Sequence, residues 1–176
     1  MIEFTPENIF LNGKQIKKIV EDLSKKIERF YEEKSDVLLV AILDGAKTFS
    51  DNLLKHLSRK FFIRYIKAKS YEGTITTKDV DIDSSDLGMI QGRNILIVND
   101  IYDKGYTLSS VLDLLFTMKP STLYSCVLLE REDNHDMDVN VDFVGYKFKD
   151  DSFLVGYGLD YNGEYREVPF IFKVKK

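Results

Sequence analysis

The segment ILIVNDIYDKGYTL, residues 95–108, carries the pattern that decides the fold. Its first four residues are apolar and suit a short buried strand, and polar residues begin at Asn99. A tight turn containing Gly105 follows. Apolar residues then recur at helical spacing over residues 108–118, with Pro120 as a stop. A buried strand that passes through a short turn into a helix is typical of α/β folds.

The flanking segments repeat this alternation of strands and helices. Asn12 followed by Gln15 forms a capping-box pattern at the start of a helix over residues 12–33, and a second helix is expected after Gly45. Apolar runs predict strands at residues 37–43, 61–68, 95–98 and 122–129, with further short strands near Phe143, at 153–157 and at 168–174. We therefore predict one α/β domain over residues 1–176, with a largely parallel twisted sheet flanked by helices.

Composition narrows the classes of function. The chain has 176 residues, of which 44% are hydrophobic, which suits a single globular core. A net charge of −4 argues against binding nucleic acid through bulk positive charge. One cysteine and two histidines argue against a disulfide framework and a zinc centre. Any metal is therefore expected to be a hard cation held by oxygen atoms.

The N-terminus and the hydropathy pattern favour a soluble protein. The first residues, MIEFTPENIF, lack the basic start and apolar run of a signal peptide. No stretch approaches the roughly 18 apolar residues that a membrane-spanning helix needs. We predict a cytoplasmic protein that does not enter a membrane.

The strand–turn–helix segment also carries candidate chemistry. In open α/β sheets, ligands bind beyond the carboxyl ends of the strands, where turn and helix amides favour an anion. Gly105 allows close approach of a phosphate, and Thr107 can add a hydroxyl donor. The sequence is neither a Walker A loop nor a GxGxxG fingerprint. Asp100 and Asp103 suit a ligand with hydroxyl groups and a site that needs a base, as a phosphorylated sugar would require.

A polar stretch over residues 69–93 interrupts the alternation of strands and helices. It contains three glycines and four aspartates between Asp79 and Asp86. A long, weakly structured segment inside a compact domain is uncommon unless it forms a lid or a binding loop. We predict a mobile lid over residues 70–92, with a solvated hairpin as the alternative.

Four motifs together resemble the type I phosphoribosyltransferases, which bind 5-phosphoribosyl-1-pyrophosphate (PRPP). Asp100-x-x-Asp103-x-Gly105-x-Thr107 after a strand is similar to the family signature. VAILDGAKTFSDNLL resembles the pyrophosphate-binding strand end, and KSYEGT resembles the start of the mobile loop. DSFLVGYGLDYNGEYRE resembles the purine-binding segment of hypoxanthine-guanine phosphoribosyltransferases. The resemblance covers residues 38–168 and implies that family's fold, with a small hood built from roughly residues 1–12 and 140–176.

The resemblance implies a role for each matching residue. The 5′-phosphate would be held by Asp103, Lys104, Gly105, Tyr106 and Thr107, and the ribose hydroxyls by Asn99 and Asp100. Pyrophosphate would be bound by Leu43, Asp44, Gly45 and Arg166, with a peptide bond at this strand end that is often cis in the family. Ser70 and Tyr71 would begin the lid. The purine would be bound by Arg131, Phe153, Leu154 and Asp160, with Mg²⁺ at Asp160 and Asp100. Asp103 would be the catalytic residue that accepts a proton from the purine.

Three residues depart from the family pattern. Asn99 stands where the family usually has an acidic residue, which removes one negative charge near the metal. Lys104 replaces a usual threonine and can reach either the phosphate or the solvent. The family lysine that contacts the purine 6-oxygen falls at Glu130 or Arg131. We predict that Arg131 takes this role, because a guanidinium donates to a carbonyl oxygen and an ionised glutamate cannot.

The implied activity is transfer of phosphoribose from PRPP to hypoxanthine, guanine or both, in purine salvage. The products would be IMP or GMP and pyrophosphate, and the family resemblance implies a homodimer or a homotetramer. An alternative is a non-catalytic phosphoribosyltransferase-fold regulator that senses PRPP or nucleotides. A second alternative, a receiver-like module, is disfavoured because the chain lacks the early acidic pair that such a module needs.

Overall fold

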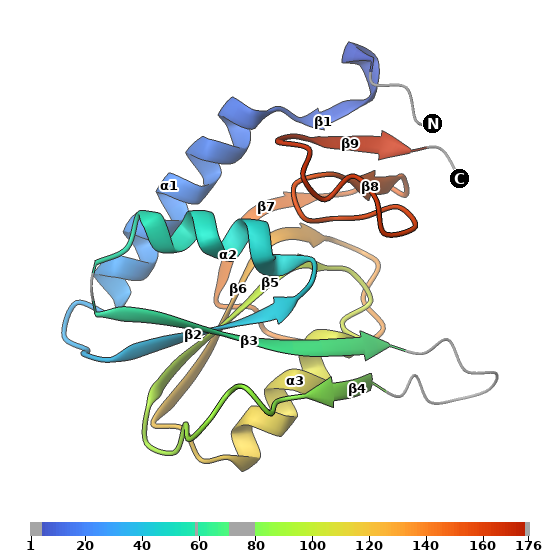
Figure 1. The fold of residues 1–176 in the computed structure, drawn as a ribbon. Helices are drawn as coiled ribbons and strands as arrows, with labels where there is room; N and C mark the ends of the chain where they lie inside the picture. Colours follow the sequence, from blue (N-terminus) through green and yellow to red (C-terminus); the bar gives the residue numbers. More distant parts are fainter. Residues whose placement is uncertain (1–4, 59, 71–79, 175–176) are drawn as a thin grey trace.

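A computed structural model describes residues 5–58, 60–70 and 80–174 and shows a mixed sheet, a smaller sheet and three α-helices (Figure 1). The helical elements are η1 (Pro6–Asn8), α1 (Gly13–Phe30), α2 (Ala46–Lys55) and α3 (Tyr106–Thr117). The strands are β1 (Ile9–Leu11), β2 (Val37–Leu43), β3 (Phe61–Ser70), β4 (Val80–Asp83), β5 (Asn94–Tyr102), β6 (Thr122–Arg131), β7 (Phe143–Phe148), β8 (Phe153–Val155) and β9 (Ile171–Val174).

The main sheet has six strands in the order β4-β3-β2-β5-β6-β7. Strands β3, β2, β5, β6 and β7 run parallel, and β4 adds an antiparallel edge beside β3. The predicted α/β class with a largely parallel sheet is therefore confirmed. Strand β2 is followed by a connection toward β3 on one side, and β5 by a connection toward β6 on the other. The two connections diverge, so the carboxyl ends of β2 and β5 border a crevice, the usual ligand site of such sheets.

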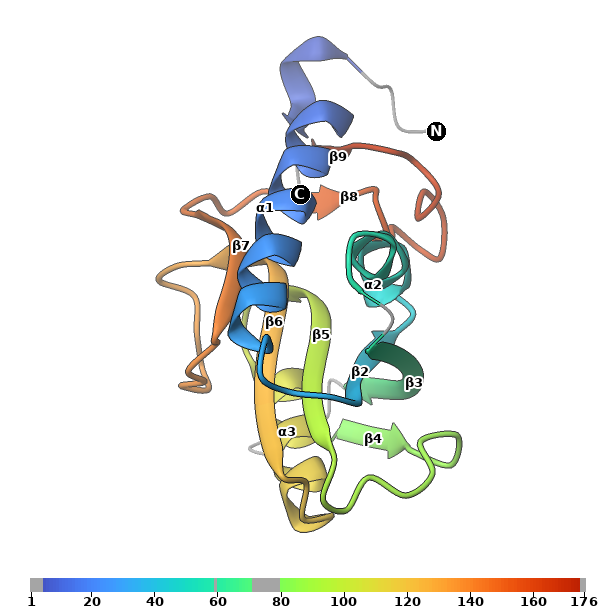
Figure 2. The same ribbon diagram turned by 90° about the vertical axis from the view of Figure 1, so that its left-hand side faces the viewer.

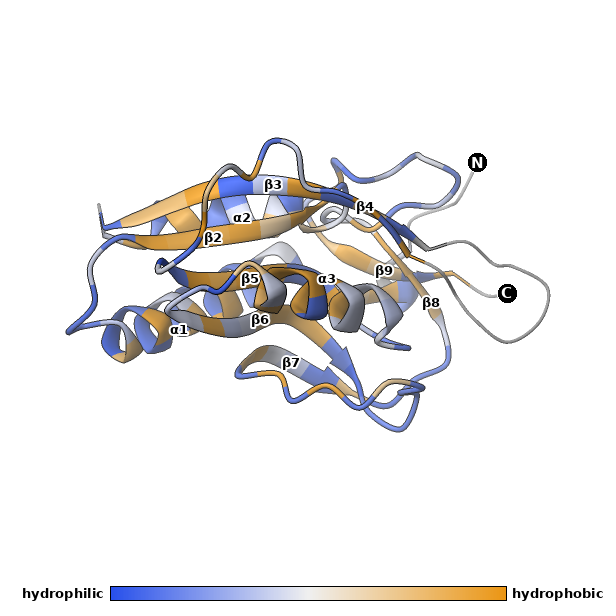
Figure 3. Cartoon of the chain, turned by 90° about the horizontal axis from the view of Figure 1, so that it is seen from below, coloured by the Kyte–Doolittle hydropathy of each residue, from blue (hydrophilic) through white to orange (hydrophobic). Residues whose placement is uncertain are grey.

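Both faces of the central strands are buried, which explains their continuous apolar sequences. Val37, Leu39 and Ala41 of β2 pack into a core with α1 and α2, whereas Leu38 and Val40 pack into a second core with α3. Figure 2 shows α1 and α2 on one side of the sheet and α3 at its other side, and Figure 3 shows the apolar colouring of β2 and β5. The helices after β2 and β5 thus cover opposite faces, and their N-termini flank the crevice.

Strand β5 is longer than the sequence pattern predicted. The apolar run stops at Val98, but pairing with β6 continues from Asn94↔Thr122 to Tyr102↔Glu130. Asn99 and Asp100 therefore lie inside the strand, and not after it as predicted. Because successive side chains of a strand alternate between faces, these two polar groups reach opposite sides of the sheet edge.

The small sheet, which we call the hood, has the order β1-β9-β8 and caps one end of the molecule (Figure 1). Its strands come from residues 9–11, 153–155 and 171–174. The predicted hood began near residue 140, which is wrong because β7 pairs with β6 in the main sheet. An ion pair between Asp150 and Lys173 ties the segment after β7 to the hood.

The predicted lid over residues 70–92 is anchored in its second half. Strand β4 pairs with β3, and Leu87 and Ile90 are only 2% and 1% exposed in the core beneath α3. Residues 80–92 are therefore not the weakly structured segment that their polarity suggested. The remaining part, residues 71–79 with Tyr71, lies outside the described residues. In the described part of the chain, no helix is long and apolar enough to cross a membrane.

Candidate active site

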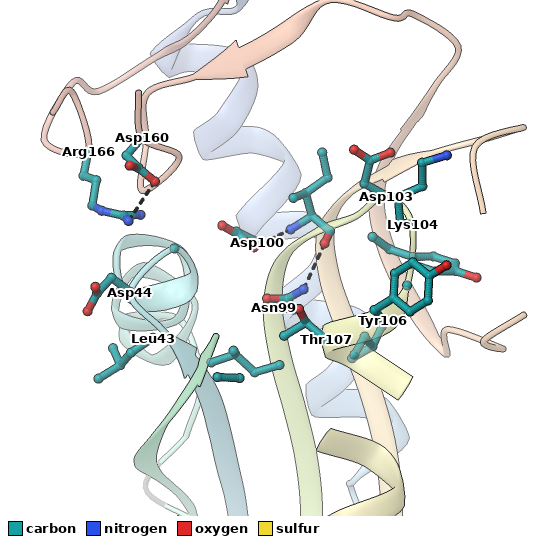
Figure 4. A pocket seen from close by; sticks show the side chains of 17 residues that line it. Leu43, Asp44, Asn99, Asp100, Asp103, Lys104, Tyr106, Thr107, Asp160 and Arg166 are labelled. Carbon is teal, nitrogen blue, oxygen red and sulfur yellow. Dashed lines mark hydrogen bonds and ion pairs between the residues drawn. The ribbon is translucent and has the colours of Figure 1, made fainter. Parts of the chain in front are cut away.

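A cavity of about 490 Å³ opens at the crevice between β2 and β5, within the size range of small-molecule sites (Figure 4). Its lining includes the predicted site residues Leu43, Asp44, Gly45, Asn99, Asp100, Asp103, Lys104, Gly105, Tyr106, Thr107, Asp160 and Arg166. These residues come from three separate segments of the chain. The structure therefore brings together groups that the sequence linked only by motif resemblance.

The end of β2 forms one wall of the cavity. The Leu43–Asp44 peptide bond is cis, and Gly45 is the N-cap residue of α2. A Cβ on Gly45 would lie 1.8 Å from Oδ2 of Asp100, so a larger residue at this position would displace this carboxylate. The wall therefore presents main-chain groups and the start of a helix, which together favour a phosphate-type anion.

The turn between β5 and α3 forms the opposite wall. Gly105 has φ +93° and precedes the first residue of α3. A Cβ at this position would also lie 2.9 Å from the carbonyl oxygen of Met137, in the loop after β6. Glycine is thus required both by the left-handed backbone and by close packing, while the N-terminus of α3 faces the cavity.

The loop between β6 and β7 supports this turn. The backbone N–H groups of Asp136 and Met137 each donate to the carbonyl oxygen of Lys104 at 3.0 Å. The Lys104 ammonium lies 3.4 Å from the Asp136 carboxylate, and the Tyr106 hydroxyl donates to Asp136 at 3.0 Å. The Lys104 side chain is therefore tied to this loop. From its sequence position alone, this lysine could have reached either a phosphate or the solvent.

Asn99 and Asp100 occupy the centre of the cavity (Figure 4). The Asn99 amide donates to the carbonyl oxygen of Ile101 at 2.9 Å, which leaves its own oxygen as an acceptor for a ligand hydroxyl. Asp100 accepts from the Ile101 N–H at 2.8 Å. Burial raises the pKa of Asp100 to about 6, against the lowering effects of that N–H and of Arg166. A cation bound beside Asp100 would favour its ionised form.

Asp103 sits where the cavity meets a smaller one of about 200 Å³, lined also by Asp100, Ile101, Arg131, Phe153, Leu154, Leu159 and Asp160. Arg131 Nε donates to Asp103 Oδ1 at 3.1 Å, and the Asn134 amide donates to the same oxygen. Both hydrogen bonds from the described residues thus fall on one carboxylate oxygen.

Arg131 and Glu130 point in different directions, as neighbours on a strand must. Arg131 is 7% exposed and lines the smaller cavity, and its Nη2 donates to the Ser152 carbonyl at 3.1 Å. Its Nη1 is buried and has no hydrogen-bond partner among the described residues. Glu130 instead pairs with Lys147 at 2.9 Å. Arg131 therefore lines the smaller cavity, and Glu130 does not.

The hood supplies the far wall of the smaller cavity. Phe153 at the start of β8 is 40% exposed and lines the smaller cavity, so part of its ring is open to stacking. Leu154 follows it on the edge strand of the hood sheet, so part of this strand's backbone is open to a ligand. The space between Phe153 and Arg131 suits a flat ring that carries a hydrogen-bond acceptor.

Comparisons with known proteins agree with this geometry. The sequence matches the phosphoribosyl transferase domain over residues 7–162. The chain belongs to the phosphoribosyltransferase family. It is 37% identical over 175 residues to a hypoxanthine-guanine phosphoribosyltransferase of Aquifex aeolicus, covering 95% of this chain and 94% of that protein. It is 34% identical over 166 residues to a hypoxanthine-guanine-xanthine phosphoribosyltransferase of Tritrichomonas foetus, covering 94% and 90%.

Solved structures of phosphoribosyltransferases share the fold. A hypoxanthine phosphoribosyltransferase of Trypanosoma cruzi superposes with a TM-score of 0.91 at 27% identity, covering 99% of this chain and 94% of the other. A hypoxanthine-guanine phosphoribosyltransferase of Bacillus anthracis gives 0.84 at 33% identity, covering 99% and 100%. The predicted type I phosphoribosyltransferase fold is confirmed.

In this phosphoribosyltransferase, Asp100 and Asp160 are the carboxylates that could hold a metal. Asp160 pairs with Arg166 at 2.7 Å and accepts from the Gly163 N–H at 2.7 Å. No group of three or more His, Cys, Asp or Glu side chains is arranged to hold a metal within the described ranges. Two carboxylates that line one cavity nevertheless fit Mg²⁺, because this ion usually takes one or two protein carboxylates and fills its other coordination positions with water and substrate oxygens.

Sequence reasoning missed the loop that follows β6. The polar composition of residues 133–138 is typical of a solvated turn, but Asp136 contacts the turn between β5 and α3, and Asn134 contacts Asp103. No periodic pattern marks this role, because it depends on tertiary contact between segments about 30 residues apart. Of the predicted lid residues, Ser70 ends β3 and Tyr71 lies outside the described residues.

Proposed function

We propose that this phosphoribosyltransferase transfers phosphoribose from PRPP to a 6-oxopurine, hypoxanthine or guanine or both, and acts in purine salvage. The observation that carries the proposal is the small cavity lined by Asp103, Arg131 and Phe153, which shares Asp103 with the larger cavity. It combines a carboxylate, a guanidinium that can donate to a purine 6-carbonyl, and an aromatic ring for stacking. The relatives named above act on the same class of base.

PRPP would lie in the larger cavity. Its 5′-phosphate would be bound by the turn of residues 103–107 and the start of α3, and its ribose hydroxyls by Asn99 and Asp100. Its pyrophosphate would meet Leu43, Asp44 and Gly45, with Arg166 as a cationic partner. The two helix N-termini at opposite walls support this placement of the two anionic ends.

The purine would lie in the smaller cavity. Phe153 would stack on the ring, the Leu154 backbone would read its edge, and Asp160 would lie beside it. Arg131 would donate to the 6-oxygen. Adenine carries a 6-amino group, which offers Arg131 no acceptor, so this base would be rejected.

The reaction requires the bond from C1 of ribose to pyrophosphate to break and a bond from C1 to purine N9 to form. C1 becomes cationic as pyrophosphate leaves, and Arg166 would stabilise the departing negative charge. Asp103 would accept the N7 proton of the purine. Mg²⁺ held by Asp100 and Asp160 would supply further neutralisation of the pyrophosphate when bound.

Two further features belong to the proposal. We propose a homodimer or homotetramer, supported by the relatedness to the Trypanosoma cruzi enzyme, whose C-terminal region was studied for its oligomeric state. Light scattering coupled to gel filtration tests this assembly. A cytoplasmic location stays a prediction from the sequence.

The test is pyrophosphate release from PRPP and Mg²⁺ with hypoxanthine, guanine and xanthine in turn, with adenine and uracil as controls. We expect release and nucleotide formation with hypoxanthine or guanine, and none with adenine or uracil. PRPP binding without turnover on any base would overturn the proposal in favour of the regulator alternative.

A further inference from the structure

The carboxylate of Asp103 is held on one side only. Arg131 Nε and the Asn134 amide both donate to Oδ1. Oδ2 receives no hydrogen bond from the residues that the structure describes. The side chain is therefore fixed by one oxygen, while the other is available to a ligand in the smaller cavity that Asp103 lines.

The loop that carries Asn134 is held by the turn between β5 and α3 and by the end of β5. Its neighbours Asp136 and Met137 donate to the Lys104 carbonyl. The Tyr102 hydroxyl donates to the Met137 carbonyl at 2.7 Å and accepts from the Val139 N–H at 3.0 Å. The loop that carries Asn134 is thus held by the Lys104 carbonyl and by the Tyr102 hydroxyl, the two residues that flank Asp103 in the sequence.

The two donors on Asp103 differ in charge and in other duties. Arg131 is a cation whose remaining groups contact the Ser152 carbonyl and line the base cavity. Asn134 is neutral, so its amide can orient the carboxylate without the loss of basicity that a second cation would cause. This combination suits a group that must stay ionised and still accept a proton.

We propose that Asn134 is a positioning residue for Asp103, which holds Oδ1 so that Oδ2 faces the purine N7 proton. The proposal rests on the proposed function, because it assigns a partner to the proton acceptor of that reaction. Nothing in the family signature around residues 100–107 identifies Asn134, which lies on a different loop.

The test compares Asn134→Ala with Asp133→Asn. Asp133 precedes Asn134 and is 72% exposed in an ion pair with Lys149, with φ +67°. Asparagine tolerates such a backbone, so Asp133→Asn perturbs the loop without touching Asp103. The other charged groups near Asp103 are Arg131, Lys104, Asp136, Asp100 and Asp160, and neither variant changes them.

For Asn134→Ala we expect kcat to fall roughly tenfold, with the KM for PRPP within about twofold of wild type. The acidic limb of the pH–rate profile should move to higher pH, because a donor that favours the ionised carboxylate is gone. Asn134→Asp should move it further, since it adds a like charge. Asp133→Asn should leave all three quantities near wild type.

A merely structural role predicts a different pattern, in which kcat, PRPP affinity and thermal stability fall together and the pH profile stays in place. That result, or an equal effect in Asp133→Asn, would overturn the proposal. A crystal structure of Asn134→Ala without substrate gives a readout separate from activity. We expect the Asp103 carboxylate to adopt more than one orientation there, and an unchanged single orientation would also contradict the proposal. An inactive wild-type enzyme would instead count against the proposed function.

Discussion

The two walls of the candidate site come from regions built in different ways. The main-sheet wall, residues 43–45 and 99–107, follows strands that are buried on both faces and presents two helix N-termini together with the side chains of Asn99, Asp100 and Asp103. The hood wall, residues 153–166, follows short strands and presents side chains, among them Phe153 and Arg166. Under the proposed function, the main-sheet wall would bind both anionic ends of PRPP, largely through backbone groups at two helix N-termini. The hood would add Arg166 beside the pyrophosphate and Phe153 as the ring that stacks on the base.

Asp103 and Arg131 lie on the main-sheet side of the boundary between these regions. Arg131 ends β6, yet its guanidinium reaches the Ser152 carbonyl just before the hood strand β8. Asp103 lines both cavities. Substitutions at these two residues should therefore change kcat or the KM for the base while leaving PRPP binding nearly intact.

The largest effect is expected for Asp103→Asn. Asparagine keeps the shape and most hydrogen bonds of the turn but cannot accept the proton, so kcat should fall by about 10²–10⁴-fold. PRPP affinity should hold or improve, because a negative charge near the phosphate is removed. Steady-state kinetics on the best purine at pH 7–8 check this. Turnover within about threefold of wild type would show that Asp103 only shapes the turn.

An intermediate effect is expected for Arg131→Ala. Loss of a charged donor to the 6-oxygen should raise the KM for the base by roughly 10–100-fold and leave the KM for PRPP nearly unchanged. Glu130→Ala is the matched control, because Glu130 is its neighbour on β6 and pairs with Lys147 outside the cavity. If Glu130→Ala raised the KM for the base and Arg131→Ala did not, the assignment of these two residues would be reversed.

The smallest effect concerns stability and arises within the main-sheet wall. The pKa of Asp100 is raised by burial to about 6 from an ordinary value of 3.8. The folded chain therefore holds a proton that the unfolded chain releases between about pH 4 and 6, so this group destabilises the fold as pH rises through that window. Asp100→Asn should raise the melting temperature by roughly 5–10 °C at pH 8 without ligand.

The same substitution should weaken PRPP binding, because the ribose hydroxyls and the metal lose a carboxylate. At pH 4 the two proteins should melt at nearly the same temperature. Thermal denaturation at both pH values checks the sign. A lower melting temperature for Asp100→Asn at pH 8 would contradict this, because it would show that the ionised carboxylate stabilises the fold.

The same contrast explains what the sequence could predict. Strands β2 and β6 and helix α1 follow from local pattern, and the Asn12–Gln15 capping box is present with hydrogen bonds of 3.0 and 2.9 Å. The glycine turn before α3 also follows from its sequence, because φ +93° at Gly105 favours glycine. Local sequence thus predicts those parts of the site that are built from the main chain of a strand end or a turn.

Features that depend on distant contacts could not be predicted this way. The polar strand β4 forms because β3 offers an edge, and β5 continues past its apolar run because β6 pairs with it. Asn134 contacts Asp103 across a loop whose composition resembles a solvated turn. The side of the sheet to which the Arg131 side chain points depends on the register of β6, and a shift of one residue would have placed Glu130 there instead.

The division between the two walls is tested most directly by calorimetric titration of PRPP with Mg²⁺ into Gly45→Ala and Phe153→Ala, without any purine. A Cβ at residue 45 would lie 1.8 Å from Asp100 Oδ2 and displace a group of the main-sheet wall, whereas Phe153 belongs to the hood and lines the smaller cavity. We predict that Gly45→Ala weakens PRPP binding at least about tenfold, while Phe153→Ala stays within about threefold of wild type. Equal losses in both variants, or a larger loss in Phe153→Ala, would contradict the account.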